Sequence, residues 1–244
     1  MSYKYKLYGA ILGDLCGQPY EFPVMQHFPK IKDIDLLNPN SHITDDTIMT
    51  LATARSIMYN TNIEHEYKYM GLKYPEAGYG KGFKAWLKTP PGTTNDSYAN
   101  GCLMRFSPFI YILLSCHLHG KGIESIRCSH AHADSYTACQ QLLHLYEPMS
   151  KIKIGKYKKP KKFKKFDVSA LGTVDFVAQV FMNTQTTEEA IKLAISCGGD
   201  TDTNASIVGE LCNYKYKDIT AKQARYVESK LDPYLLKILK DFNK

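Results

Sequence analysis

Apolar residues recur at helical spacing along most of this chain, whereas the alternation typical of β-strands is scarce. This spacing predicts helices over residues 45–58, 101–119, 187–197, 203–212 and 220–242. Pro108 interrupts the second of these stretches, and Pro233 is expected to open a last helix within the fifth. We therefore predict an all-α fold in which residues 1–244 form one compact multi-helix domain.

The length of the chain and its cysteines limit how the fold can be stabilised. A chain of 244 residues can bury a full core without disulfide bonds. The seven cysteines are odd in number and no pair has C-x-x-C spacing, which favours free thiols over disulfides or a zinc ribbon. No apolar run approaches the ~18 residues of a membrane span, and the first residues do not form a secretory signal. We expect a cytoplasmic protein with no membrane partner.

Lysines are concentrated in one segment. Nine of them lie within residues 151–165, and they exceed the formal net charge of +7 by themselves. We predict a lysine-rich surface loop over residues 150–167. It is either a solvated loop or a patch that attracts polyanions such as nucleic acid or acidic partners. Because the rest of the chain is close to neutral, nucleic acid is not expected to be the main partner.

Two acidic clusters, residues 44–47 (Thr-Asp-Asp-Thr) and 198–203 (Gly-Gly-Asp-Thr-Asp-Thr), stand at predicted helix starts. Each could be only a helix cap, because Thr and Asp satisfy the first amides of a helix. Carboxylates held close together repel, however, unless a proton or a cation lies between them. Together the clusters form a hard-oxygen ligand set that suits two Mg²⁺ or Mn²⁺ ions and argues against zinc. Such a site requires the fold to bring two helix N-termini together.

Other polar residues accompany these clusters. Glycines at 13 and 17 allow close helix packing, and Glu21 follows on a loop, where a carboxylate can act as a base or be only a solvated acid. Residues 95–105 carry hydrogen-bonding groups, an aromatic ring in Tyr98, and Arg105, which could meet a phosphate or a structural carboxylate. His130 and His132 form a His-x-His pair, for which we favour a polar ligand contact over metal coordination.

Taken in order from Leu7 to about Phe242, these segments resemble the ADP-ribosylglycohydrolase family. This family includes dinitrogenase-reductase-activating glycohydrolase and the ADP-ribosylarginine and ADP-ribosylserine hydrolases. Similar to its motifs are residues 9–14 with Glu21, 44–49, 78–80, 97–101 with 104–105, 129–130, 167–174 and 198–203. The two acidic motifs are highly specific in combination, and the resemblance is strongest to short bacterial and viral-type members.

The resemblance implies a dinuclear Mg²⁺ or Mn²⁺ centre in a central cleft of an all-α fold. The implied metal ligands are Thr44, Asp45, Asp46, Asp200, Asp202 and Thr203. The implied catalytic residues are Glu21, Asp45, Asp46 and Asp202, with Glu21 as a mobile acid beside the ions. The implied contacts to ADP-ribose are Ser97, Tyr98, Asn100, Gly101 and His130.

The implied activity is hydrolysis of the glycosidic bond between ADP-ribose and an acceptor, by a monomer. The acceptor could be an arginine or serine side chain, a small molecule such as guanidine, or a nucleic-acid base. Two alternatives stay open: a module that binds ADP-ribose without turnover, and a hydrolase of another nucleoside diphosphate or N-glycoside. Ala99 and Ala133 stand where the family has Gly and Pro, and residues 211–215 lack its usual small residues. These departures affect packing and ligand loops but leave the implied metal ligands intact.

Overall fold

The computed structural model describes residues 3–21, 28–113, 119–146 and 158–244. The α-helices are α1 (Tyr8–Gly17), α2 (Asp45–Tyr59), α3 (Ile63–Lys73), α4 (Lys81–Trp86), α5 (Gly101–Met104), α6 (Ser107–Leu113), α7 (His119–Ser129), α8 (Ala133–Tyr146), α9 (Ala170–Met182), α10 (Thr187–Cys197), α11 (Thr201–Tyr216), α12 (Ala221–Ser229) and α13 (Pro233–Phe242). Short 3₁₀ turns occupy Gln18–Tyr20 and Ile31–Asp33. Within the described ranges the backbone forms no β-strand, and one isolated bridge pairs Ala99 with Ser169. The predicted all-α fold is confirmed.

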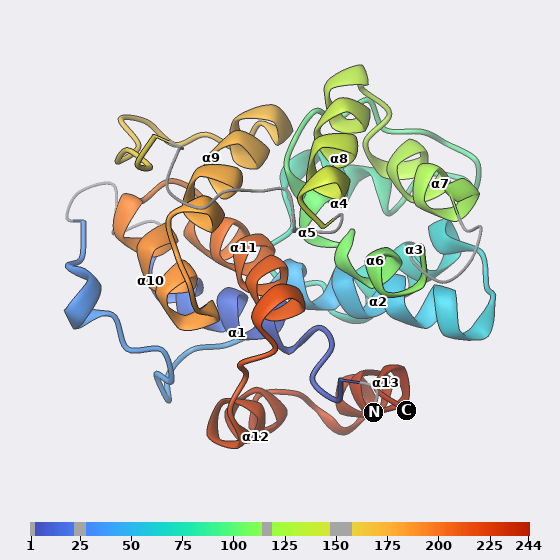
Figure 1. The fold of residues 1–244 in the computed structure, drawn as a ribbon. Helices are drawn as coiled ribbons and strands as arrows, with labels where there is room; N and C mark the ends of the chain where they lie inside the picture. The colour runs from blue at the N-terminus through green and yellow to red at the C-terminus, as the bar shows by residue number, and fades with distance from the viewer. Residues whose placement is uncertain (1–2, 22–27, 114–118, 147–157) are drawn as a thin grey trace.

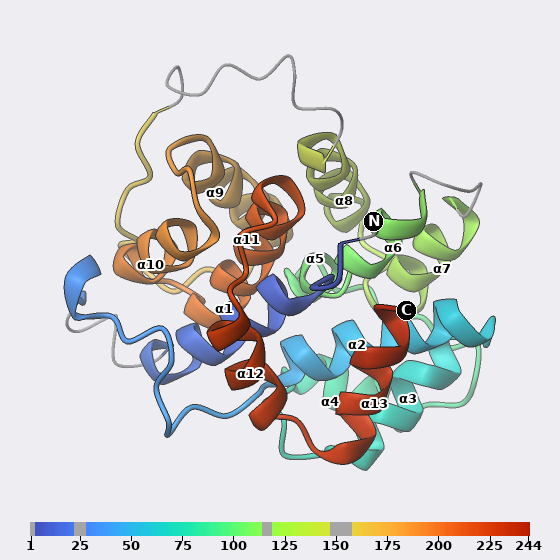
Figure 2. The ribbon, with the colours of Figure 1, turned by 60° about the horizontal axis from the view of Figure 1, so that its bottom comes forward.

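The centre of the molecule is the antiparallel pair of α1 and α11 (Figures 1 and 2). Glycines at every fourth position of α1 lie against the backbone of α11: Gly9 meets Gly209, Gly13 meets Ala205, and Gly17 meets Thr201. A Cβ on Gly13 would lie only 2.1 Å from the carbonyl oxygen of Ala205. The pair can therefore approach closely only because these positions have no side chain, as the glycines at 13 and 17 predicted.

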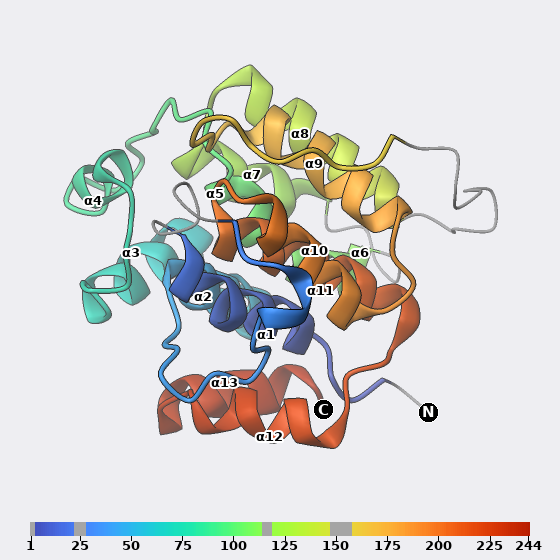
Figure 3. The same cartoon turned by 90° about the vertical axis from the view of Figure 1, so that its left-hand side faces the viewer.

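Two groups of helices can be followed from the contacts of α11 and of α2, which both pack against α1. Helices α9 and α10 pack against α11, and α3, α6 and α13 pack against α2 (Figure 1). Helices α12 and α13 lie below α1 and α2 at the opposite end of the molecule from residues 158–168 (Figure 3). The first turns of α2 and α11 carry the buried residues Asp46 and Asp202.

The helix boundaries follow local capping signals. Thr44 and Thr186 cap α2 and α10 through their hydroxyls, which accept the amides of Asp46 and Glu189. Helix α10 spans the residues predicted for it, and Pro233 opens α13 as expected. The predicted stretch 203–212 is the middle of the longer α11, and 220–242 forms two helices because residues 230–232 do not continue α12.

The core is continuous through the described helices and contains the described cysteines as buried free thiols: Cys16, Cys102, Cys128, Cys139, Cys197 and Cys212. Within the described residues, no helix is both long enough and apolar enough to cross a membrane. Cys116 and residues 150–157 of the predicted lysine-rich loop lie outside the described residues, whereas 158–168 run outside any helix.

Candidate functional site

The two acidic clusters meet at the N-termini of α2 and α11. The hydroxyl of Thr203 donates a hydrogen bond to Oδ2 of Asp46 at 3.0 Å, joining residues 157 positions apart. The side-chain Nδ2 of Asn100 donates to Oδ2 of Asp200 at 2.9 Å, which ties the 97–101 loop to the same place. The fold thus brings together the segments that a shared site requires.

The turn before α11 is built on two glycines. Gly198 and Gly199 have φ values of +79° and +78°, a conformation that favours glycine, and they reverse the chain between α10 and α11. Asp200 is the N-cap residue of α11, yet its side chain makes no capping hydrogen bond. Capping therefore explains Thr44 but does not explain the carboxylate of Asp200.

The carboxylates form two adjoining groups of three. Asp14, Asp46 and Asp202 each contribute an oxygen to a set that lies within 4.8 Å of one another. Glu21, Asp200 and Asp202 form a second such set. Asp202 belongs to both, so the two groups share one side chain. Asp45 is in neither group and lies in the wall beside them.

Burial and mutual repulsion make this cluster costly without a cation. Burial raises the pKa of Asp46 and of Asp202 well above the usual carboxyl value, and their acidic neighbours add to both shifts. Burial, followed by repulsion from Asp200 and Asp14, raises the pKa of Glu21 to about 7. Oδ1 of Asp46 is buried and has no hydrogen-bond partner among the described residues. An all-oxygen set with an unused acceptor fits a hard divalent cation.

Asp14 is the site residue that sequence reasoning did not select. It is fully buried, and its carboxylate accepts hydrogen bonds from the amide of Thr44 at 3.0 Å and from its hydroxyl at 2.8 Å. The amide and hydroxyl of Thr47 donate to it as well. Asp14 therefore holds the start of α2 in place. The available signal was an ionisable residue in the middle of an otherwise apolar, glycine-faced helix.

A cavity of about 740 Å³ opens above the carboxylates. Its lining includes the predicted residues Glu21, Thr44, Asp45, Asp46, Ser97, Asn100, Gly101, His130, Asp200, Asp202 and Thr203. Tyr98 is not part of the lining: its side chain is 54% exposed, and its ring packs edge-on against that of His132, 5.8 Å away. The cavity has the size of a small-molecule binding site.

Arg105 is buried beside the cavity. Its guanidinium lies between the rings of Tyr67 and Phe83, 4.9 and 4.8 Å from their centroids, and Nε donates to the carbonyl of Gly101. Its positive charge opposes the burial that raises the pKa of Asp45 to about 7. The sequence had left a phosphate or a carboxylate as the partner of Arg105, and the structure places the carboxylate of Asp45 within its electrostatic reach.

The two histidines of the His-x-His pair separate. His130 lines the cavity, and burial, with a smaller contribution from Arg105, holds its pKa well below the usual value, so the ring is neutral. His132 is partly exposed, and its Nδ1 lies 3.7 Å from the carboxylate of Asp134. Among the described residues, neither histidine belongs to a cluster with metal-ligand spacing.

Comparisons with known proteins identify a family and a similar fold. The family model of the ADP-ribosylglycohydrolases matches residues 4–147. Among solved structures, an ADP-ribosylglycohydrolase-related protein complex has a similar fold, with a TM-score of 0.71 and 20% sequence identity; the match covers 100% of this chain and 98% of that chain. None of the curated proteins compared with the sequence matches it. The family match spans more than half of the chain and includes the first acidic cluster, so the chain belongs to the ADP-ribosylglycohydrolase family.

Proposed function

We propose that this protein is a divalent-metal-dependent hydrolase that cleaves the glycosidic bond between ADP-ribose and an acceptor. The observation that carries the proposal is the pair of three-carboxylate groups sharing Asp202 at the base of a cavity of about 740 Å³. Family membership supports glycohydrolase chemistry, and the cavity is large enough for a nucleotide-sized ligand.

Two Mg²⁺ or Mn²⁺ ions fit the residues present. Asp46, Asp200 and Asp202 would hold them, with the hydroxyls of Thr44 and Thr203 and the nearby carboxylate of Asp45. When bound, such ions supply Lewis acidity and fixed positive charge beside the hydroxyls of the ribose. They would also neutralise the repulsion that burial imposes on the carboxylates.

The side chains around the cavity have separate roles in the proposed reaction. Glu21 follows the 3₁₀ turn Gln18–Tyr20, is partly exposed, and stands beside Asp200 and Asp202. In this proposal it takes a proton from the attacking water, an effect typically worth ~10²–10⁴ in rate. Leaving-group departure builds positive charge on the ribose.

The ligand-binding part of the cavity is held in shape by hydrogen bonds. Asn100 donates to Thr173 at 3.2 Å as well as to Asp200, so its loop is fixed relative to the carboxylates. Neutral His130 and the backbone at Gly101 face the cavity nearby. Uncharged donors beside a fixed loop suit the polar parts of ADP-ribose.

The test is incubation with peptides that carry ADP-ribose on arginine or on serine, with Mg²⁺, with Mn²⁺ and with EDTA. We expect free ADP-ribose only when a divalent ion is present, and we expect Glu21→Gln to bind ADP-ribose while releasing about 10²-fold less product. Tight binding without release by the wild-type chain would instead identify a binding module. Release that persists in EDTA would overturn the metal assignment.

A further inference from the structure

A surface beside the cavity remains unused by the proposed reaction. Residues 158–166 read Lys-Lys-Pro, Lys-Lys-Phe, Lys-Lys-Phe, so a unit of two lysines and one apolar residue occurs three times in succession. All six lysines of this segment are exposed, whereas Pro160 and Phe163 are half-buried. The repeat therefore turns its lysines to the outside, and no acidic residue interrupts them before Asp167.

This segment is fixed to the body of the protein. The amide of Phe163 donates to the carbonyl of Cys197 at 2.8 Å, and Asn183 donates to the carbonyl of Lys158 at 3.2 Å. The ring of Phe163 packs against Phe176 in α9, 4.8 Å between centroids, and covers Gly199. These contacts fix the backbone of the segment from which the exposed lysines project.

This segment ends at the mouth of the cavity. Phe166, the last residue of the third unit, lines the cavity and has a side chain that is 43% exposed. Beyond it, the backbone pairs with the 97–101 loop: the amide of Asn100 donates to the carbonyl of Val168, and the bridge joins Ala99 to Ser169. The exposed ring of Tyr98 lies on this paired loop.

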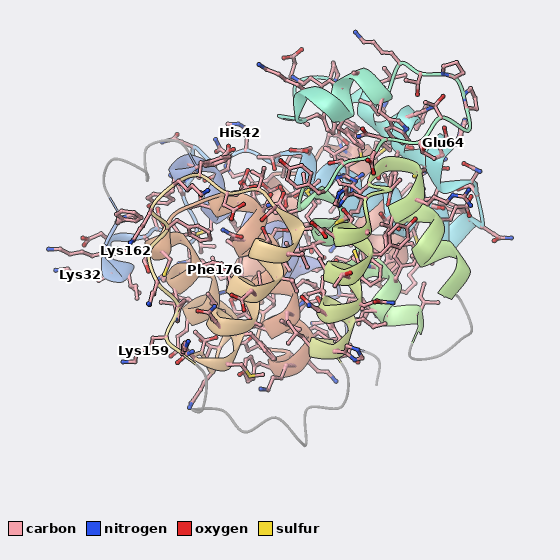
Figure 4. All side chains as sticks on the ribbon, turned by 90° about the horizontal axis from the view of Figure 1, so that it is seen from above. Lys32, His42, Glu64, Lys159, Lys162 and Phe176 are labelled. Atoms are coloured by element: carbon pink, nitrogen blue, oxygen red, sulfur yellow. The ribbon has the colours of Figure 1, made fainter. Side chains whose placement is uncertain are left out.

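A neighbouring segment adds to the same face. The ammonium of Lys162 lies 4.6 Å from the centroid of the Phe28 ring, which links residues 158–166 to the segment that carries Lys30 and Lys32. Lys32, Lys159 and Lys162 project from one side of the molecule (Figure 4). We call residues 158–166 together with the ring of Tyr98 the lysine surface.

We propose that the lysine surface binds single-stranded nucleic acid. A row of exposed ammonium groups attracts phosphates, and exposed aromatic rings at its end offer faces on which bases can stack. An acidic protein segment would match the charges, but its carboxylates do not stack on the rings of Phe166 and Tyr98, whereas bases do. The combination of both features favours a nucleic-acid strand.

The test is fluorescence anisotropy of the full chain with a labelled oligothymidylate of about 16 nucleotides, the upper end of typical site sizes. We expect binding at low salt whose logarithmic salt dependence has a slope of about −3 to −4, as for four to six phosphates on a single strand. The quadruple change K161Q/K162Q/K164Q/K165Q should weaken binding by about tenfold or more.

A matched control removes the same charge elsewhere. K222Q/K237Q/K240Q/K244Q changes four exposed lysines on and after α12 and α13, at the far end of the molecule, and should alter binding by less than about twofold. Thermal melting checks that both variants are folded. Phe166→Ala should weaken binding by about fivefold or more if bases stack there.

Three results would overturn the proposal: no binding at low salt, equal losses in the two quadruple variants, or polyglutamate competing as well as unlabelled oligothymidylate. The last result would identify an acidic-protein surface instead. Oligonucleotide binding needs no hydrolysis, so it can fail while ADP-ribose release succeeds, and the reverse is equally distinguishable.

Discussion

The hydroxyl of Thr203 lies 3.0 Å from Oδ2 of Asp46, although 157 residues separate them along the chain. This contact marks the point where the N-termini of α2 and α11 meet. Helix N-termini carry partial positive charge, which favours carboxylates placed in their first turns. The helix ends therefore help to hold the acidic groups that a cation would then neutralise.

Changing Thr203 to Val tests the joint between the two helices. The variant keeps the shape of the side chain but loses the hydroxyl that bonds Asp46, so we expect divalent-ion affinity to fall by about 10–100-fold. Isothermal titration with Mn²⁺ measures it. Thr201→Val is the control, because the hydroxyl of Thr201 donates to the carbonyl of Gly17 and not to a carboxylate. Equal Mn²⁺ affinity in the two variants would contradict a role for Thr203.

Asp202→Asn should separate the effect of the acidic cluster on stability from its role in metal binding and activity. Because Asp200 and Asp46 repel Asp202, the variant in EDTA should melt at or above the temperature of the wild type. The stabilisation of the folded protein by Mg²⁺ should disappear in this variant. For one ion at 100 times its dissociation constant, that stabilisation is about 2.7 kcal/mol. Release of ADP-ribose should fall by about 10²-fold or more.

The control for this charge change is Asp175→Asn on the exposed face of α9, where the carboxylate accepts a hydrogen bond from the side chain of Gln179. It should keep both the stabilisation by Mg²⁺ and the release of ADP-ribose. If Asp202→Asn retained both properties as well, the shared position of Asp202 would have no functional meaning.

Gly13→Ala tests the close approach of α1 and α11. The added Cβ would lie 2.1 Å from a backbone oxygen of Ala205, which cannot rotate away, so we expect a loss of about 3 kcal/mol or more in the free energy of unfolding. Gly82→Ala in α4 has no atom within 4 Å of the new Cβ and should gain about 0.5–1 kcal/mol. Urea denaturation of both variants measures the difference in the free energy of unfolding. Similar midpoints for the two variants would contradict the close approach of α1 and α11.

The sequence predicted the helix boundaries that are set by residues next to them along the chain. The Thr-Glu-Glu signal forms the first turn of α10 and the Gly-Gly signal follows its last residue, and both predicted boundaries are confirmed. Between α5 and α6 the sequence located a break but not its form. Pro108 stands in the first turn of α6, where proline is tolerated, and the interruption falls at residues 105–106.

The remaining site features depend on contacts between distant segments. Asp14 was not selected because its donors belong to Thr44 and Thr47, about thirty residues away, and only the fold brings them together. The contact of Phe163 with Gly199, which anchors the lysine surface, likewise joins segments that are distant in the sequence. Ligand chemistry could predict that two acidic turns converge, but it could not predict which carboxylate the two groups share.

Glu210 gives the fold a pH dependence that is separate from the metal cluster. Its buried carboxylate accepts the amides of Leu7 and Ala10, each at 3.0 Å, and so binds the N-terminus of α1, where Leu7 provides no side-chain cap. Burial raises the pKa of Glu210 from 4.5 to about 7, although its hydrogen bonds oppose the shift. The folded state therefore holds a proton that the unfolded state releases.

The sign of the effect follows from proton linkage. Between pH 4.5 and about 7 the folded state binds more protons at Glu210 than the unfolded state does, so stability is greatest at the acidic end and falls as pH rises. Glu210→Gln cannot ionise, so its stability relative to wild type should improve by about 2–3 kcal/mol from pH 5 to pH 8. Urea denaturation in EDTA at both pH values measures this difference, from which the acidic cluster cancels because both proteins contain it.

Glu124→Gln changes an exposed glutamate of α7 and is the control. It should keep the wild-type pH dependence of stability, since an exposed carboxylate carries no burial cost to remove. A pH-independent gap between wild type and Glu210→Gln would show that Glu210 stays ionised throughout.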